Sequence, residues 1–132
     1  MPNKKVLIIE DDAEWIHFFK TQFNEDPRFK DVMMLQASSL AQARHLFLEN
    51  PDVAIITVDG ILEGTEIKDS AKFVEYIRYR TDYRGPLVAG SSGEDFNEIL
   101  VLAGCTHFYH KTKLLNGIAG LLEEQENKDP GS

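Results

Sequence analysis

The sequence is poor in the residues and runs that mark several classes of protein. Its single cysteine, Cys105, cannot form a disulfide within the chain, and the four histidines lack the spacing of a zinc site. The apolar run near the amino terminus, Val6–Ile9, is too short for a signal segment or a membrane span. We therefore expect a soluble, untargeted protein of the reducing cytoplasm.

Positive charge is also scarce, with 14 Lys and Arg against 22 Asp and Glu, and the net charge is −8. Long-range repulsion of this kind opposes binding to phosphate backbones and anionic lipid. The sequence thus predicts no direct nucleic-acid contact and no membrane contact. Its 132 residues, of which 42% are hydrophobic, are typical of one globular domain.

Short apolar runs alternate with segments of helical periodicity along the whole chain. Helices are expected around Trp15–Phe23, from the capping box Ser39–Gln42 to Pro51, from Asp69, from Ser92–Asp95 to Gly104, and over Leu114–Leu122. The predicted strands are Val6–Ile9, Val32–Gln36, Val53–Val58, Leu87–Ala89 and Thr106–Tyr109. Such alternation predicts a single α/β domain, residues 1–132, with a doubly wound parallel sheet covered by helices on both faces. The core is expected over about residues 4–122, followed by a polar, fraying tail over 123–132.

Polar residues follow four of the predicted strands directly. Glu10–Asp12 follow the first, Asp59 the third, Ser91–Ser92 the fourth and Lys111 the fifth. Because parallel strands end at one edge of a sheet, these side chains should gather there. Carboxylates without His or Cys suit Mg²⁺, while a lysine and a hydroxyl suit a phosphoryl group. The pattern predicts an aspartyl-phosphate site with magnesium as its cofactor.

Four motifs in order carry a resemblance to a known family. They are VLIIEDD (6–12), PDVAIITVDGIL (51–62), PLVAGSS (86–92) and AGCTHFYHK (103–111). With these motifs the chain resembles, from about Lys4 to Leu122, the receiver domain of two-component response regulators. The resemblance implies a flavodoxin-like fold, a five-stranded parallel sheet flanked by helices with strand order 2-1-3-4-5.

The resemblance also implies the parts of a phosphoacceptor site. Asp59 would accept the phosphoryl group, and Glu10 and Asp11 would be the acid pair that holds Mg²⁺, with Asp11 as the direct ligand. The backbone carbonyl of Ile61 would complete the protein ligands. Asp12 is expected to cap the following helix instead.

A second group would bind the phosphoryl oxygens and switch the domain. Ser91 would be the switch hydroxyl, Lys111 the cation, and Phe108 the aromatic residue that turns inward when Ser91 moves. Backbone N–H groups of Gly60 and Ser92 would add contacts. Ser92 is also expected to cap the fourth helix.

The implied function is a phosphorylation-controlled switch and not a conventional enzyme, with only self-phosphorylation and slow self-dephosphorylation. Its partners would be a histidine kinase or phosphotransfer protein and a downstream protein bound at the fourth helix, fifth strand and fifth helix. A monomer or weak homodimer is expected. The chain departs from the family where Glu63 and Thr112 occupy usual proline positions and where the loop 60–69 is longer.

Two alternatives stay open at this point. The longer loop would suit a pseudo-receiver, which binds partners without phosphorylation. Residues 57–62, TVDGIL, resemble the D-x-D-G-T-[LV] motif of haloacid-dehalogenase-like phosphohydrolases. In that family the nucleophile would occupy the position of Thr57, which lacks a carboxylate.

Overall fold

Five parallel strands form one sheet in the computed structural model, which describes residues 4–128. The order is β2-β1-β3-β4-β5. The strands are β1 (Lys4–Ile9), β2 (Val32–Ala37), β3 (Ile55–Val58), β4 (Leu87–Ala89) and β5 (His107–Phe108). The predicted fold class and strand order are confirmed.

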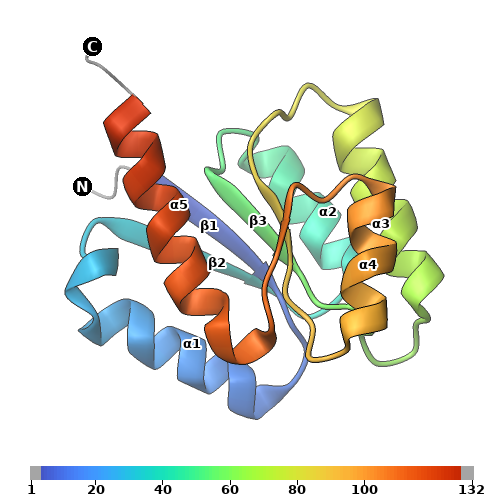
Figure 1. Cartoon of the computed structure of the whole chain (residues 1–132), viewed down its shortest axis with the longest axis horizontal. Coiled ribbons are helices and arrows are strands. Elements are labelled where there is room, and N and C mark those ends of the chain that lie inside the picture. Colours follow the sequence, from blue (N-terminus) through green and yellow to red (C-terminus); the bar gives the residue numbers. More distant parts are fainter. Residues whose placement is uncertain (1–3, 129–132) are drawn as a thin grey trace.

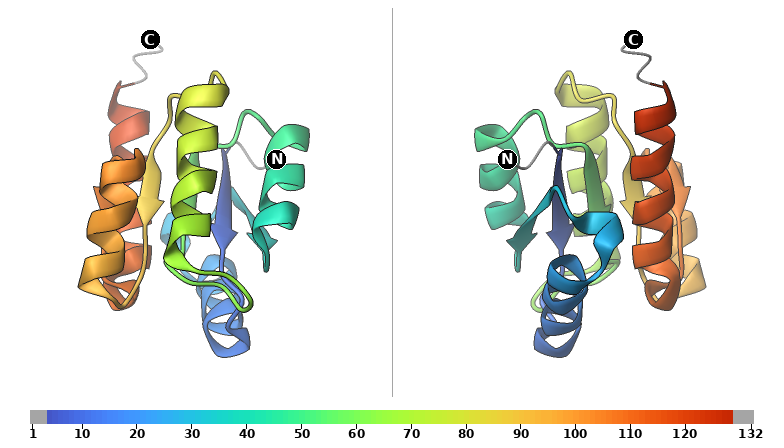
Figure 2. Two further views of the ribbon diagram at one scale, coloured as in Figure 1. Left: turned by 90° about the vertical axis from the view of Figure 1, so that its right-hand side faces the viewer. Right: turned by 90° about the vertical axis from the view of Figure 1, so that its left-hand side faces the viewer.

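The helices lie on both faces of the sheet (Figures 1 and 2). Helices α1 (Ala13–Glu25) and α5 (Leu114–Lys128) cover one face. Helices α2 (Leu40–Glu49), α3 (Ile67–Arg80) and α4 (Glu94–Ala103) cover the other. Two 3-10 turns, Pro27–Phe29 and Lys111–Lys113, were not predicted from the sequence.

The central strands are apolar on both sides because both faces of the sheet are covered. In β1, Val6 and Ile8 join the cluster under α1 and α5, while Leu7 and Ile9 join the cluster under α2, α3 and α4. Side chains of a strand alternate between its two faces, so a β-branched run without polar residues is what two cores require. This explains why Val6–Ile9 shows no polar alternation.

Side-chain caps begin the first two helices as predicted. The Asp12 carboxylate accepts hydrogen bonds from the N–H groups of Glu14 and Trp15, and the Ser39 hydroxyl accepts one from Gln42. The prediction that Ser92 caps α4 is wrong. The N-cap is Gly93, one residue later than expected, and its N–H donates to the hydroxyl of Ser91 at 3.1 Å.

Three further boundaries differ from the prediction. Strand β3 begins at Ile55, not Val53, and α3 begins at Ile67, not Asp69. Strand β5 comprises only His107–Phe108. Thr106, just before β5, bonds to Leu87 both through its backbone N–H, which donates to the Leu87 carbonyl, and through its side-chain hydroxyl.

The fifth helix continues to Lys128, beyond the predicted end of the core at Leu122. Gln125 explains the extension, since its side-chain amide donates to the carbonyl of Ala54 at 3.1 Å and accepts from Lys4 Nζ at 3.0 Å. Residues 129–132 of the predicted tail lie outside the described residues. Over residues 4–128, none of the helices combines the length and the hydrophobicity that crossing a bilayer requires.

Two glycines of α5 allow a matched test of packing. A Cβ at Gly120 would meet nothing within 4 Å, whereas one at Gly117 would lie 2.5 Å from the ring of Tyr109. We expect Gly120→Ala to raise the free energy of unfolding by about 1 kcal/mol, because alanine is the better helix former. Gly117→Ala should lower it, because the Tyr109 ring must leave its place. Urea unfolding measures both, and a loss of stability in Gly120→Ala would contradict the packing described.

Candidate functional site

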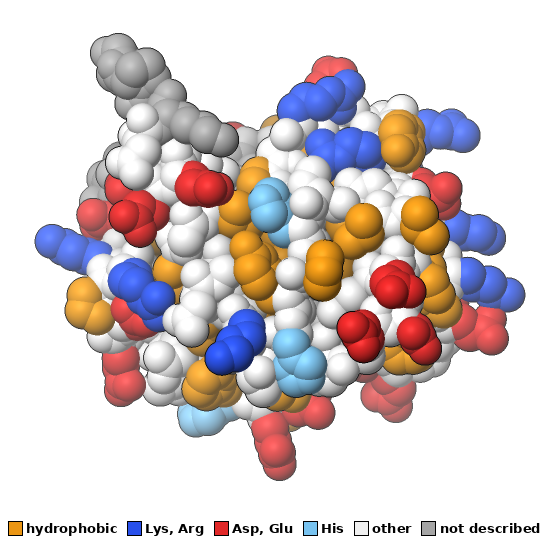
Figure 3. Space-filling view, viewed as in Figure 1, with side chains coloured by type: hydrophobic (Ala, Val, Ile, Leu, Met, Phe, Trp, Pro, Cys, Tyr) orange, Lys and Arg blue, Asp and Glu red, His pale blue; other side chains and the backbone are white. Residues whose placement is uncertain are grey.

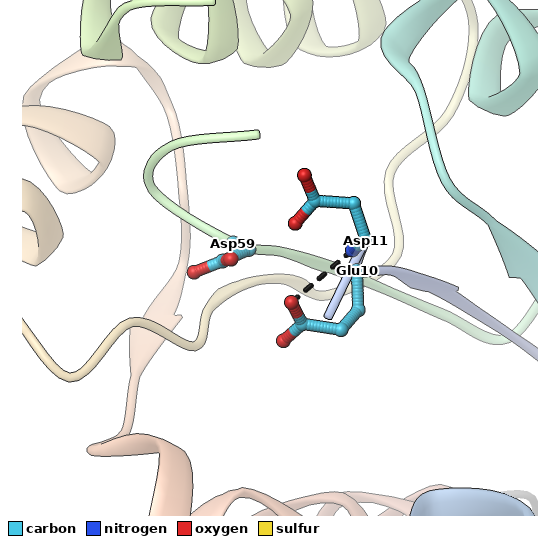
Figure 4. A group of neighbouring side chains, drawn as sticks. All are labelled: Glu10, Asp11 and Asp59. Atoms are coloured by element: carbon cyan, nitrogen blue, oxygen red, sulfur yellow. Dashed lines mark hydrogen bonds between the residues drawn. The ribbon is translucent and has the colours of Figure 1, made fainter. Parts of the chain in front are cut away.

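Three carboxylates meet at the carboxyl ends of β1 and β3. One oxygen from each of Glu10, Asp11 and Asp59 lies within 4.8 Å of the others. Figure 4 shows these side chains, with the Glu10 carboxylate folded back to accept a hydrogen bond from the backbone N–H of Asp11. Glu10 and Asp59 are buried. The predicted convergence of these acids at one edge of the sheet is therefore present in the structure.

Lys111 supplies the positive charge among these acids. Its Nζ lies 2.8 Å from Glu10 Oε1 and 3.4 Å from Asp59 Oδ2, and the side chain is buried. It begins the 3-10 turn that follows β5, where the His110 imidazole accepts a hydrogen bond from the N–H of Thr112. Among residues 4–128 no peptide bond is cis, in agreement with Thr112 at the usual proline position.

The electrostatics of the site follow from burial and crowding. Burial and the negative charge of Glu10 raise the pKa of Asp59 from 3.8 to about 6, although Lys111 opposes this shift. Burial alone would lower the pKa of Lys111, but its contacts with Glu10 and Asp59 more than offset this, and the pKa lies above the usual value. Lys111 therefore stays charged, while Asp59 is ionised only above mildly acidic pH.

The donor set fits a hard divalent cation. All of the atoms are oxygens, as Mg²⁺ prefers, and the crowded carboxylates have an excess of negative charge over the single lysine. Both Glu10 oxygens are already engaged, one by Lys111 and the other by the N–H groups of Asp11 and Asp12. The carbonyl of Ile61 accepts no hydrogen bond from any residue in 4–128. The acid cluster of Glu10, Asp11 and Asp59 therefore offers the kind of oxygen ligands that a hard divalent cation prefers.

The predicted phosphate and switch residues fall into two groups, one beside the acid cluster and one at the surface. Ser91 is buried, and a Cβ built on Gly60 would lie 3.1 Å from its hydroxyl, so the two residues are in close contact. The Gly60 N–H donates to Asp59 Oδ1 at 2.8 Å. Ser92 is exposed, and Phe108 points outward with 61% of its surface exposed. The structure thus groups Gly60 and Ser91 with the acids and leaves Phe108 at the surface.

The longer loop after Asp59 is tied to the acid cluster. The backbone N–H of Glu63 donates to Asp11 Oδ2, and the Thr65 hydroxyl bonds to both backbone groups of Leu62. Gly64 has φ of +80°, in the left-handed region that favours glycine. Leu62 is buried. The extra residues therefore form an ordered turn over Asp11.

Sequence reasoning missed Asn97. The apolar periodicity of this segment favours Phe96, Ile99, Leu100 and Ala103 as the inner face of α4. In the structure Ile99 is 38% exposed, and the buried residues are Asn97, Leu100 and Ala103. The three buried residues are spaced three positions apart, so a helical pattern that included Asn97 could have been found in the sequence. A polar residue was not assigned to that face because its partners, the backbone groups of Ser91, are fixed only by the fold.

Trp15 of α1 also contacts the site. Lys111 Nζ lies 5.4 Å from the centre of its ring, within the range of a cation–π interaction. Because it is the single tryptophan, we expect its fluorescence to change saturably when Mg²⁺ is added. A titration of wild type against Asp11→Asn tests this. The variant should need more Mg²⁺, and an identical response in both would exclude Asp11 as a metal ligand.

No family model matches the chain, and no curated protein matches it in sequence. Solved structures with the same fold include receiver domains. A two-component response regulator from Clostridium difficile has a TM-score of 0.74 at 18% identity, over 93% of this chain and 98% of that one. The receiver domain of the histidine kinase CKI1 from Arabidopsis thaliana, complexed with Mg²⁺ and BeF₃⁻, has a TM-score of 0.70 at 18% identity, over 95% of this chain and 91% of that one. The Mn²⁺-bound response regulator Rcp1 has a TM-score of 0.66 at 15% identity, over 95% of this chain and 93% of that one. These similarities show that the chain has the fold of receiver domains.

Proposed function

We propose that this chain is a receiver domain of a two-component system, in which Asp59 accepts a phosphoryl group and thereby switches a protein-binding surface. The observation that carries this proposal is the placement of three carboxylates and one buried lysine at one edge of a β2-β1-β3-β4-β5 sheet. The same fold occurs in receiver domains, one of them solved with Mg²⁺ and BeF₃⁻. A cytoplasmic location is part of the proposal.

The donor would be a phosphohistidine of a histidine kinase or phosphotransfer protein. An oxygen of the Asp59 carboxylate attacks phosphorus, the phosphorus–nitrogen bond breaks, and the released imidazole takes up a proton. Asp11, Asp59 and the Ile61 carbonyl would hold Mg²⁺, and Glu10 would hold Lys111 in place. Bound there, Mg²⁺ would neutralise charge on the phosphoryl oxygens.

The residues of the chain would supply positioning and charge. Lys111 lies 3.4 Å from Asp59, close enough to contact an oxygen of a group attached there. The Ser91 hydroxyl and the N–H groups of Gly60 and Ser92 are the proposed hydrogen-bond donors. Because phosphoryl transfer has a loose transition state, such positioning accounts for most of the rate enhancement.

The proposed output surface comprises α4, β5 and α5. Leu102 is 86% exposed and Phe108 61%, and both line a hollow of about 420 Å³ together with Val101, Glu94 and Glu98. Figure 3 shows hydrophobic side chains and a group of acidic ones over α4. Apolar side chains beside acidic ones favour a partner segment that is both apolar and basic. Phosphorylation would alter this surface by drawing Ser91 toward the phosphate and Phe108 inward.

Intact-protein mass after incubation with acetyl phosphate tests the proposal. Wild type should gain one phosphoryl group only when Mg²⁺ is present, and Asp59→Ala should gain none. A wild type that gains nothing would overturn the proposal and favour the pseudo-receiver. Gain in Asp59→Ala would mean a different acceptor residue. Hydrolysis of small phosphate esters would be the sign of a phosphohydrolase, although Thr57 is buried in β3 and has no carboxylate.

A further inference from the structure

Asn97 is a buried polar residue whose whole side-chain amide is used on one neighbour. It lies on α4 with 5% of its surface exposed. Its Oδ1 accepts a hydrogen bond from the N–H of Ser91 at 3.1 Å, and its Nδ2 donates to the carbonyl of Ser91 at 3.0 Å. A buried amide needs hydrogen-bond partners, and here both partners are backbone groups of Ser91.

The Ser91 side chain has two further close neighbours, Gly93 and Gly60. Its hydroxyl accepts from the N–H of Gly93, which leaves the hydroxyl proton free to be donated elsewhere. Gly60, which follows Asp59, is so close that a Cβ there would lie 3.1 Å from the Ser91 hydroxyl and 2.8 Å from Phe96. The hydroxyl is thus directed by a backbone that Asn97 fixes at two points.

Asn97 also reaches the outer surface of the domain. It lines the hollow that contains Val101, Leu102 and Phe108. Asn97 therefore lies between the backbone of Ser91 and the hollow at the surface of α4 and β5.

We propose that Asn97 is the positioning residue for Ser91: its amide fixes the Ser91 backbone so that the hydroxyl is directed at a phosphoryl group on Asp59. This rests on the proposed function. Without the amide, the N–H and carbonyl of Ser91 recover hydrogen-bond partners only by moving, and the hydroxyl moves with them.

Amide hydrogen exchange tests the clamp without any ligand. In Asn97→Ala the N–H of Ser91 should exchange at least about tenfold faster than in wild type, because its acceptor is gone. The neighbouring N–H of Gly90, which donates to the carbonyl of Val58, should keep its protection. Equal acceleration at both amides would mean general destabilisation and would overturn the inference.

Affinity for beryllofluoride in the presence of Mg²⁺ tests the effect on the site. Asn97→Ala should bind about tenfold more weakly than wild type, as loss of one buried hydrogen-bonding group predicts. In a Ser91→Ala background the same substitution should change the affinity little, because its effect acts through the missing hydroxyl. Equal losses in both backgrounds would overturn the inference. Asn116→Ala, an exposed asparagine of α5, is the matched control and should bind like wild type.

Two further outcomes separate the inference from the proposed function. If wild type itself fails to bind beryllofluoride with Mg²⁺, the proposed function fails, while the exchange experiment still decides whether Asn97 holds Ser91. If Asn97→Ala does not fold, Asn97→Asp replaces it, since Asp retains the acceptor for the Ser91 N–H but not the donor. That variant should keep the Ser91 amide protected and still bind more weakly, and wild-type affinity would overturn the inference.

Discussion

Replacing Lys111 by methionine is expected to lower the free energy of unfolding by about 3 kcal/mol in buffer without divalent metal, because it leaves buried Glu10 and Asp59 without their cation. Methionine fills a similar volume, so loss of charge and not of packing dominates. Added Mg²⁺ should stabilise the variant more than wild type, since a bound cation would replace the missing positive charge. Urea unfolding with EDTA and with Mg²⁺ measures both effects.

Lys113 provides the matched control for this experiment. It belongs to the same 3-10 turn, but its side chain is exposed and forms no ion pair with any described residue. Lys113→Met should therefore unfold within about 0.5 kcal/mol of wild type. If Lys111→Met and Lys113→Met lower the free energy of unfolding equally, the charge of Lys111 does not stabilise the buried carboxylates.

The second large effect is the pH dependence caused by Asp59. Its pKa is raised from 3.8 to about 6 in the folded protein, so the folded state holds this proton more tightly than the unfolded chain. The protonated Asp59 therefore contributes its full share to the free energy of unfolding below about pH 4, and this contribution is lost as the pH rises through 6. With allowance for solvent near the carboxylate, the loss amounts to about 2 kcal/mol. Without metal, Asp59→Asn should be the more stable protein at pH 7.5.

Thermal unfolding of wild type and Asp59→Asn between pH 4 and 8 in EDTA measures this effect. The two curves should converge at the acidic end and separate above pH 6, with the variant higher. Saturating Mg²⁺ should narrow the gap at pH 7.5, because the metal binds only the folded protein. A variant that is less stable than wild type at pH 7.5 in EDTA would show that the Asp59 carboxylate is not electrostatically strained.

The sequence predicted the sheet and the convergence of the acids for a simple physical reason. Strands buried on both faces require uninterrupted apolar residues, and parallel strands bring their carboxyl ends to one edge. Glu10 and Asp59 follow such runs immediately, so their meeting depends only on topology. Short strands gave a weaker signal. Strand β5 comprises only two residues, although the N–H groups of Thr106 and Tyr109 on either side of it also donate to carbonyls of β4.

Hydrogen bonds that depend on the exact course of the folded backbone could not be predicted from the sequence. Asn97 could not be assigned to a buried face until its partners on Ser91 were in place. The hydrogen bond from Glu63 to Asp11 spans 52 positions and uses a backbone group, which has no sequence signature. The same holds for Gln125, whose amide extends the last helix by binding Ala54.

The strand order also has a consequence for how the chain folds during synthesis. Each strand after β2 adds to the growing edge of the sheet beside β1, β3 or β4, and none must insert between strands already paired. The strands leave the ribosome in chain order, but a single domain generally folds as one unit. Glu10 and Asp59 are therefore made before Lys111, the last residue of the acid cluster to be synthesised. We expect the sheet and the charge balance of the acid cluster to be completed in the same late step, after β5 and Lys111 have emerged.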